Sequence, residues 1–296
     1  MSARKYKERA IEGIFLSFAL VSLVALFFIM LFLFQKGLPI FRVIGPLEFL
    51  FGKSWYPTYE PPEFGILPLI MGSLFITVGA ILVAIPLGVT SAIYLAEIAH
   101  PWIREWVKPT IELLAGIPSV IYGFFGLIVL APWIQDLFNL PTGLTALTAS
   151  LLLGIMAAPT VISISEDALN SVPASYREAS LALGATRWQT TIKVVLPAAL
   201  SGISTACILG MARAIEETMA VLMVAGGATL IPTSFLQPVR PLTATIIAEM
   251  GEAIHGSPHF HALFAIGMVL FFITLGLNLL ADFLTHRFKE AGSGTL

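Results

Sequence analysis

The sequence predicts an all-α integral membrane protein with six transmembrane helices. Of its 296 residues, 57% are hydrophobic and only 11% are charged, whereas soluble domains are about 25% charged. Six apolar stretches are long enough to cross a bilayer, and the loops between them carry the charges and turn residues. With a net charge of −2, the chain also offers no basic surface for a nucleic acid.

Each predicted span follows from length, because a bilayer core of about 30 Å needs about 20 apolar helical residues. The first stretch follows a basic segment, but it is longer than a signal peptide and lacks a small-x-small cleavage site, which predicts a retained anchor. The second and fifth stretches exceed a straight crossing, so we expect bends there. Pro68 and Pro86 can kink the second, and Gly116–Ile117–Pro118 the third. The six predicted spans are Ile11–Phe34, Gly65–Ala96, Ile111–Ile134, Leu144–Ile164, Ala198–Ala225 and His261–Leu284.

The orientation follows from lysine and arginine in alternate loops, because cytoplasmic loops are enriched in these residues. Eleven of the 16 lie on the side of the two termini, four lie on the opposite side, and Arg213 lies within a span. We therefore expect both termini in the cytoplasm of a bacterium, with the spans in its inner membrane. The chain divides into a tail, first helix and external loop (1–64), a five-helix core (65–285) and a cytoplasmic tail (286–296).

The residues that catalysis requires are missing. No glycine-rich loop ends in Gly-Lys-Ser/Thr, so the chain has no such ATP site. The segment Gly202–Thr205 vaguely resembles an intramembrane protease motif, but the five histidines lie in loops or at span ends, away from any such serine. His255, His259 and His261 are interrupted by Gly256–Ser257–Pro258, which favours a solvated loop over a metal site. We expect no catalytic residue, cofactor or metal, and we expect Cys207 to be a packing residue.

The fourth loop has an extended amphipathic pattern. Pro173 suits a helix start, and the next turns place small and apolar groups on one face, at Tyr176, Ala179, Ser180 and Leu183. Gly184 ends this helix, and a second helical segment, Arg187–Val195, leads to Leu196–Pro197. The pattern predicts a helical hairpin, which either lies on the membrane surface or docks on a partner.

The same loop resembles the EAA loop of ABC importer permeases. The matching residues are Glu178–Ala179–Ser180, then Gly184 after three residues, Val194 after nine, and Leu196–Pro197 after one. Ser180 replaces alanine and Val194 replaces isoleucine in the usual pattern. The resemblance implies the MetI-like fold of type I importers, in which the loop 166–197 would be a coupling hairpin seated on a separate ATPase subunit.

Other segments resemble the PstC family, the permease subunits of phosphate-specific importers. They are Glu112–Gly123, Arg240–Thr245, Glu249–Ala253 and Ala262–Phe264. The resemblance implies transport of inorganic phosphate together with a PstA-like second permease, a PstB-like ATPase dimer and a PstS-like binding protein. A permease for molybdate, tungstate or sulfate is the alternative.

Three charges interrupt the fifth predicted span: Arg213, Glu216 and Glu217. Charge at membrane depth is costly and marks transport paths or ion pairs. Arg213 and Glu217 are spaced i to i+4 and can pair on one helical face; alternatively, the guanidinium meets phosphate oxygens in transit. The family form is Arg-Ala-x-Gly-Glu-Thr, so Glu216 replaces a glycine. We place all three on the translocation pathway.

Overall fold

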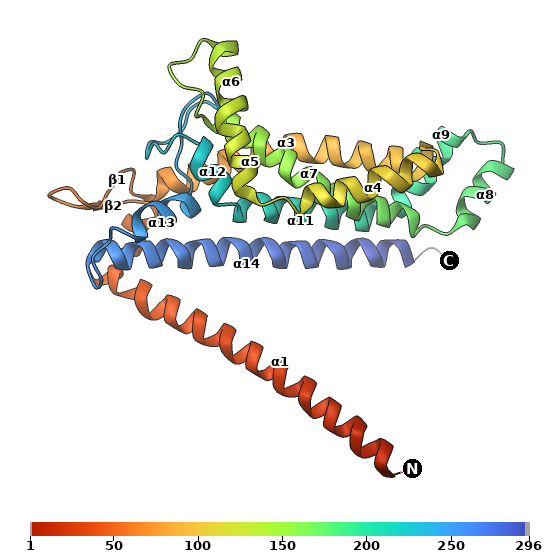
Figure 1. Cartoon of the computed structure of the whole chain (residues 1–296), viewed down its shortest axis with the longest axis horizontal. Coiled ribbons are helices and arrows are strands. Elements are labelled where there is room, and N and C mark those ends of the chain that lie inside the picture. Colours follow the sequence, from red (N-terminus) through yellow and green to blue (C-terminus); the bar gives the residue numbers. More distant parts are fainter. Residues whose placement is uncertain (1, 294–296) are drawn as a thin grey trace.

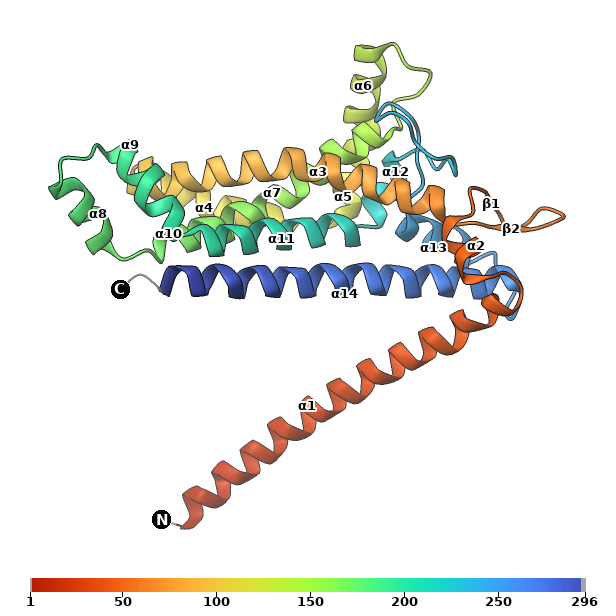
Figure 2. The same cartoon turned by 180° about the vertical axis from the view of Figure 1, so that it is seen from behind.

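The computed structural model describes residues 2–293, and its long helices, apart from the first, run side by side in a bundle (Figures 1 and 2). One end of the bundle carries α8 and α9 and is called the hairpin end; the other carries β1, β2 and α13 and is called the strand end. The long helices are α1 (Ser2–Gly37), α3 (Leu67–Ile93), α7 (Ala146–Asn170), α11 (Leu200–Glu216) and α14 (Pro258–Ser293).

Shorter elements join the long helices at both ends. Those at the hairpin end are a π-helical turn (Tyr94–Ile98), α8 (Ala174–Ala182), α9 (Arg187–Thr190), a second π-helical turn (Thr191–Val195) and α10 (Leu196–Ala198). Those at the strand end are a 3-10 turn (Leu38–Arg42), α2 (Pro46–Phe51), β1 (Trp55–Tyr56), β2 (Glu63–Phe64), α12 (Met219–Val224) and α13 (Leu242–Met250). The antiparallel pair β1 and β2 aligns Trp55 with Phe64.

The first, second, fourth and sixth predicted spans agree with helices that are long and apolar enough to cross a membrane, and the third and fifth differ as described below. Five such runs occur in the described residues, and a sixth if one bent pair counts as a single span. The five runs are Ile11–Arg42, Leu67–Ile98, Ser119–Phe138, Ala146–Asn170 and Pro258–Leu280. The last helix continues past residue 285 to Ser293, so the predicted tail begins inside a helix, and residues 294–296 lie outside the described part.

The third predicted span, Ile111–Ile134, has the wrong boundaries. Its first residues belong to α4 (Pro101–Ala115), which packs along α7. The chain then breaks, because Pro118 lacks a backbone N–H and adopts an extended conformation with ψ of 135°. Helical structure resumes in α5 (Ser119–Phe125), a π-helical turn and α6 (Ala131–Phe138).

The fifth predicted span, Ala198–Ala225, is bent, as its length predicts, and its helix is also interrupted near its far end. A bend of 70° separates the segment Arg187–Ala198 from α11. At its other end α11 stops at Glu216, because Glu217 is extended, with φ of −67° and ψ of 134°. The short helix α12 then begins at Met219. The 28 residues of this predicted span are therefore divided among three helices, α10, α11 and α12.

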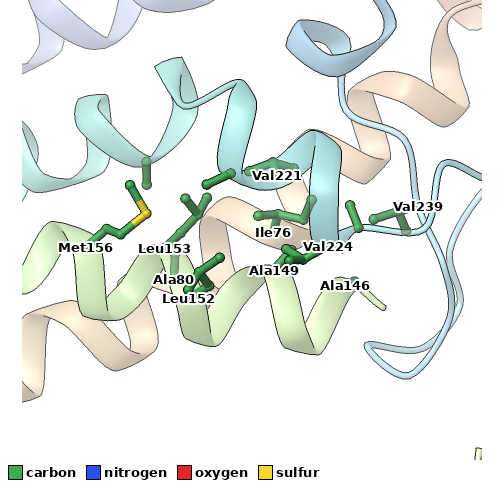
Figure 3. Packing of buried hydrophobic residues seen from close by; sticks show 13 residues of the cluster. Ile76, Ala80, Ala146, Ala149, Leu152, Leu153, Met156, Val221, Val224 and Val239 are labelled. Carbon is green, nitrogen blue, oxygen red and sulfur yellow. The ribbon is translucent and has the colours of Figure 1, made fainter. Parts of the chain in front are cut away.

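The core of the bundle is the close packing of α3, α7 and α11. Val161 of α7 lies between two glycines: a Cβ added at Gly88 of α3 or at Gly210 of α11 would lie 2.5 Å from one of its methyl groups. Towards the strand end, apolar side chains of α3 and α7 meet those of α12 (Figure 3). Small residues let helix backbones approach closely, which is how membrane helices gain packing energy.

The first helix stands apart from this core. In both views α1 diverges from α14 toward its own start (Figures 1 and 2), and its side chains from Ile11 to Phe32 are exposed. Contact with α14 is concentrated near the end of α1, where Gly37 packs against Met268. The exposed apolar surface is what a lipid-facing helix requires.

Of the three histidines expected in a solvated loop, His255 is exposed in a turn, as expected, but His259 and His261 lie in the first turn of α14 and are partly buried. His259 Nε2 lies 2.9 Å from a carboxylate oxygen of Glu249, which also receives Arg240 and the indole N–H of Trp55. His261 Nδ1 lies 2.7 Å from the carbonyl oxygen of Lys36. Glu249 thus ties α13 to β1 and to the start of α14.

Within residues 2–293, no group of three or more His, Cys, Asp and Glu could hold a metal ion.

The contact at Val161 predicts that a larger residue at Gly210 destabilises the bundle. Gly210→Val should lower the thermal unfolding midpoint in detergent, because overpacking a close helix contact costs about 1–3 kcal/mol. The control is Gly276→Val, since a Cβ at Gly276 of α14 has no atom within 4 Å. Equal midpoints for the two variants would contradict the packing described here.

Candidate functional site

The hairpin is formed by α8 and α9, and its turn is built by local sequence signals. Pro173 precedes the first residue of α8, and Gly184, with φ of +87°, turns the chain after it. A positive φ is strained for residues with a Cβ, so glycine suits this position. Thr186 then caps α9 in a reciprocal pair with Gln189. The helix start and end predicted from the sequence are confirmed.

The hairpin presents an open groove. It has a volume of about 640 Å³ and lies between α8 and the segment that follows α9. Leu183 at the turn is 90% exposed, and Trp188 is 61% exposed. The four residues predicted to share a face all line the groove, and the full lining is Ser175, Tyr176, Ala179, Ser180, Leu183, Ala185, Gln189, Lys193 and Val194. An exposed apolar groove of this kind is suited to a helical partner.

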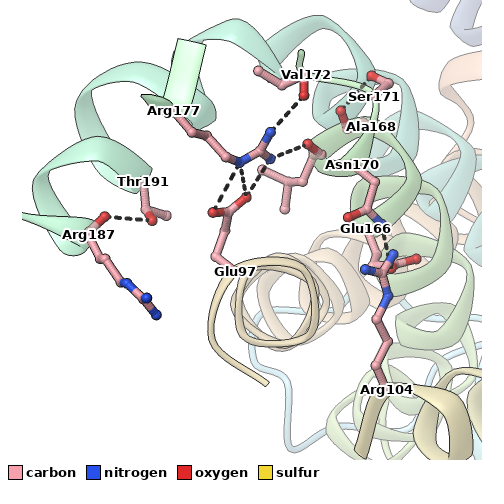
Figure 4. A network of polar contacts seen from close by, with 11 residues as sticks. Glu97, Arg104, Glu166, Ala168, Asn170, Ser171, Val172, Arg177, Arg187 and Thr191 are labelled. Atoms are coloured by element: carbon pink, nitrogen blue, oxygen red, sulfur yellow. Dashed lines mark hydrogen bonds and ion pairs between the residues drawn. The ribbon is translucent and has the colours of Figure 1, made fainter. Parts of the chain in front are cut away.

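The root of the hairpin is fixed by Arg177 of α8 (Figure 4). Its guanidinium forms an ion pair with Glu97, with Nη2 2.6 Å from Oε1. It also donates to two carbonyl oxygens near the end of α7, from Nη1 to Val172 at 2.7 Å and from Nη2 to Leu169 at 2.9 Å. A hydrogen bond of 2.9 Å between the hydroxyls of Ser180 and Thr190 joins the two arms.

A second ionic cluster joins α4 to α7 at the same end of the bundle. The carboxylate of Glu166 is only 1% exposed, and it is paired with Arg104 and, at 2.5 Å, with Lys108. Lys108 also pairs with Asp167 at 2.6 Å. Partial burial acts to lower the pKa of Lys108, but its hydrogen bonds to the two carboxylates and their charges raise the pKa overall. A buried carboxylate needs such partners.

The three charges of the fifth span lie around the break between α11 and α12. Arg213 and Glu216 are exposed, and Glu217 is partly buried. One carboxylate oxygen of Glu217 accepts hydrogen bonds from the backbone N–H groups of Thr218, at 3.1 Å, and Ala220, at 3.3 Å. Glu217 therefore caps the start of α12, where a negative charge is favourable.

The ion pair considered between Arg213 and Glu217 does not form. The helix ends at Glu216, so the two residues do not share a helical face, and the Glu217 carboxylate is engaged by backbone N–H groups. Within the described part of the chain, Arg213 has no ion pair or side-chain hydrogen bond. It is an exposed guanidinium beside a helix break, an arrangement able to meet an anion.

Comparison with known proteins identifies the family. Residues 84–290 match the family of binding-protein-dependent transport system inner membrane components. The chain belongs to this family. A probable ABC transporter permease of Bacillus subtilis, YqgH, is 44% identical and is aligned over 92% of this chain and 88% of its own length. The phosphate transport system permease PstC of Mesorhizobium japonicum is 37% identical, over 81% and 78%. That of Methanocaldococcus jannaschii, a probable PstC, is 30% identical, over 97% and 94%.

Solved structures support the fold. A structure of the MetNI methionine ABC transporter in an inward-facing conformation has a TM-score of 0.56 and 20% identity, covering 76% of this chain and 94% of that chain. A bacterial ABC transporter for alginate has a TM-score of 0.56 and 17% identity, covering 75% and 79%. The predicted fold, an all-α membrane permease of the MetI-like class, is confirmed.

Sequence reasoning missed both ionic clusters. Arg104, Lys108 and Arg177 entered only the count of positive charges, and their partners were not predicted. One signal was available: Arg104 and Lys108 are spaced i to i+4 in a segment that forms an amphipathic helix. The partners Glu97 and Glu166 lie 80 and 58 residues from Arg177 and Lys108, so no local pattern could have named them.

Proposed function

We propose that this chain is a permease subunit of an importer that carries inorganic phosphate into the cytoplasm and is driven by ATP hydrolysed on separate subunits. The single observation that carries the proposal is the exposed guanidinium of Arg213 beside the break at the end of α11. It has no partner among the described residues. An anionic substrate requires such a cation. The PstC relatives, at 30–37% identity, support phosphate as that anion.

The groove on the hairpin supports docking of an ATPase subunit. The hairpin projects from the end of the bundle, its turn is apolar and exposed, and its groove is open. A helical element docked there can transmit a rigid-body displacement between subunits. The residues proposed to contact or shape this interface are Glu178, Ala179, Ser180, Gly184, Leu196 and Pro197.

The proposed pathway runs along the break at the end of α11. Arg213 supplies positive charge, and the neighbouring acids limit how tightly an anion is held, because a site must release what it binds. Glu217 also has a structural part, since it caps α12 and its carbonyl oxygen accepts from the Thr243 hydroxyl at 3.1 Å. The Glu216 side chain is exposed, and its carbonyl oxygen accepts from the Thr218 hydroxyl at 3.1 Å.

The proposed assembly places the hairpin end in the cytoplasm. Two copies of a PstB-like ATPase would occupy that end, a PstA-like permease would complete the pathway, and a PstS-like binding protein would deliver phosphate at the strand end. The membrane is the inner membrane, with residues 1–64 and 286–296 flanking the five-helix core. Another oxyanion, such as molybdate, tungstate or sulfate, remains the alternative substrate.

The substrate and the role of Arg213 are tested together by uptake of labelled phosphate in cells that lack this gene and carry it on a plasmid. Wild type should restore uptake. Arg213→Gln should reduce uptake about ten- to hundredfold, because a charged hydrogen bond contributes about 1.5–3 kcal/mol and each 1.4 kcal/mol is a factor of ten.

The matched control is Arg42→Gln, which removes another exposed arginine, located at the strand end; it should transport normally at equal expression. Normal uptake by Arg213→Gln would reject the pathway role. Uptake of molybdate or sulfate in place of phosphate would reject the substrate.

Docking is tested at Gly184. Gly184→Glu should abolish uptake and weaken co-purification with the ATPase, because a long charged side chain would stand at the apolar turn and the backbone has a positive φ. The control is Gly256→Glu, a glycine with φ of +79° at the strand end and no atom within 4 Å of an added Cβ. Gly256→Glu should have a similar energetic cost from the positive φ, and the ATPase should still co-purify with it. Equal ATPase recovery from both variants would exclude the docking role.

The orientation is tested with single cysteines at Ser2 and Thr58 in a Cys207→Ala background. A thiol reagent that cannot cross the inner membrane should label the Thr58 site, which is exposed at the strand end, in intact cells. The Ser2 site should react only after the membrane is permeabilised. Labelling of the Ser2 site in intact cells would contradict the predicted orientation.

A further inference from the structure

Arg177 is the residue through which the hairpin meets two long helices at once. Its carboxylate partner, Glu97, lies in the π-helical turn Tyr94–Ile98, which directly extends α3. Of its two carbonyl partners, Leu169 lies in the last turn of α7, and Val172 lies just after that helix ends at Asn170. One guanidinium on α8 therefore contacts the ends of both α3 and α7 (Figure 4).

We propose that Arg177 is a positioning residue that locks the coupling hairpin to α3 and α7, so that a displacement of the hairpin moves both helices as one body. The proposal rests on the proposed docking of an ATPase on the hairpin. Arg177 is not itself placed on the docking surface, because it does not line the groove.

The geometry favours a rigid joint. The planar guanidinium presents its donors in a fixed fork, so contacts to three separate acceptors define both the distance and the orientation of α8. The Leu169 carbonyl lies in the last turn of α7, where carbonyl groups have no partner within the helix and carry partial negative charge. A lysine has a single ammonium on a flexible stem and cannot reproduce this arrangement.

The apolar contacts beneath the hairpin cannot perform this role alone. Ala92 of α3, Leu169 and Val172 pack with Val195 and Ile203 of the returning chain. Hydrophobic burial stabilises such a contact but is not directional, so the surfaces can slide over one another. The ion pair adds direction, and it is sheltered, with Glu97 11% and Arg177 25% exposed. Partly buried charges are screened by salt less than exposed ones.

A second ionic contact at the same end of the bundle provides a control. The Lys108–Asp167 pair joins α4 to α7 without touching the hairpin, and Asp167 is 65% exposed. Asp167→Asn therefore removes the carboxylate of another ion pair from the same region, at a more exposed position than Glu97. If general loss of charge at this end were damaging, this variant would be impaired as well.

The experiment uses the complete complex of both permeases and the ATPase in proteoliposomes, and compares wild type with Arg177→Gln, Arg177→Lys, Glu97→Gln and Asp167→Asn. Arg177→Gln and Glu97→Gln should retain the ATPase at the wild-type ratio but need about tenfold more ATP hydrolysed for each phosphate imported. Arg177→Lys should lie between them and wild type, and Asp167→Asn should match wild type. The double variant Arg177→Gln, Glu97→Gln should hydrolyse about as much ATP for each phosphate as either single variant, because both substitutions remove the same contact.

A second readout does not depend on the substrate. Spin labels at Ala182 of α8 and Leu87 of α3, in a Cys207→Ala background, report the distance between the hairpin and α3. In wild type the distribution of this distance should be narrow and should not change when a non-hydrolysable ATP analogue binds. In Arg177→Gln it should broaden or shift on nucleotide binding.

Two results would overturn the proposal. One is a wild-type ratio of ATP to phosphate in assembled Arg177→Gln, with an unchanged spin-label distance. The other is loss of the ATPase from Arg177→Gln, which would make Arg177 a folding or docking residue. A wild-type complex that imports no phosphate, with a distance distribution that is narrow in wild type and broadened in Arg177→Gln, would instead reject the proposed substrate and support the role of Arg177.

Discussion

The close packing of α3, α7 and α11 is the constraint on which the rest of the structure depends. Val161 lies between Gly88 and Gly210, so at that level its side chain packs directly against glycines of both α3 and α11. In a membrane there is little hydrophobic gain from bringing helices together, and close packing takes its place. With these helices fixed, the hairpin is rooted at one end and the break that exposes Arg213 is held towards the other.

Charged residues are arranged differently at the hairpin end and at the break in α11. At the hairpin end, charges are paired: Arg177 with Glu97, and Glu166 with Arg104 and Lys108. These pairs connect elements that are distant in sequence. At the break in α11, Arg213 has no partner among the described residues, and Glu217 is used by the backbone of α12. Paired charges suit a joint, and an unpaired cation suits a passing anion, which is how the structure supports a transport function.

The sequence predicts the elements better than it predicts their contacts. Span lengths and the hairpin were predictable, because apolar run length, a proline at a helix start and a glycine at a turn act locally. The break at Glu217 was not, since the residues from Arg213 to Ala220 suit a helix as well as a cap. The partners of Arg177 and Glu166 depend on the tertiary fold, so they too had to come from the structure. Among the described residues, Arg213 is unpaired because the helix breaks before Glu217. The sequence alone is compatible both with an ion pair and with a pathway role for Arg213.

The measurement that tests this account most directly is accumulation of labelled phosphate by the purified four-subunit complex in proteoliposomes, with the binding protein outside the strand end and ATP supplied at the hairpin end. The account predicts accumulation against a gradient that depends on ATP and is not diminished by excess sulfate or molybdate. Accumulation that requires no ATP, or that selects another oxyanion over phosphate, would contradict it.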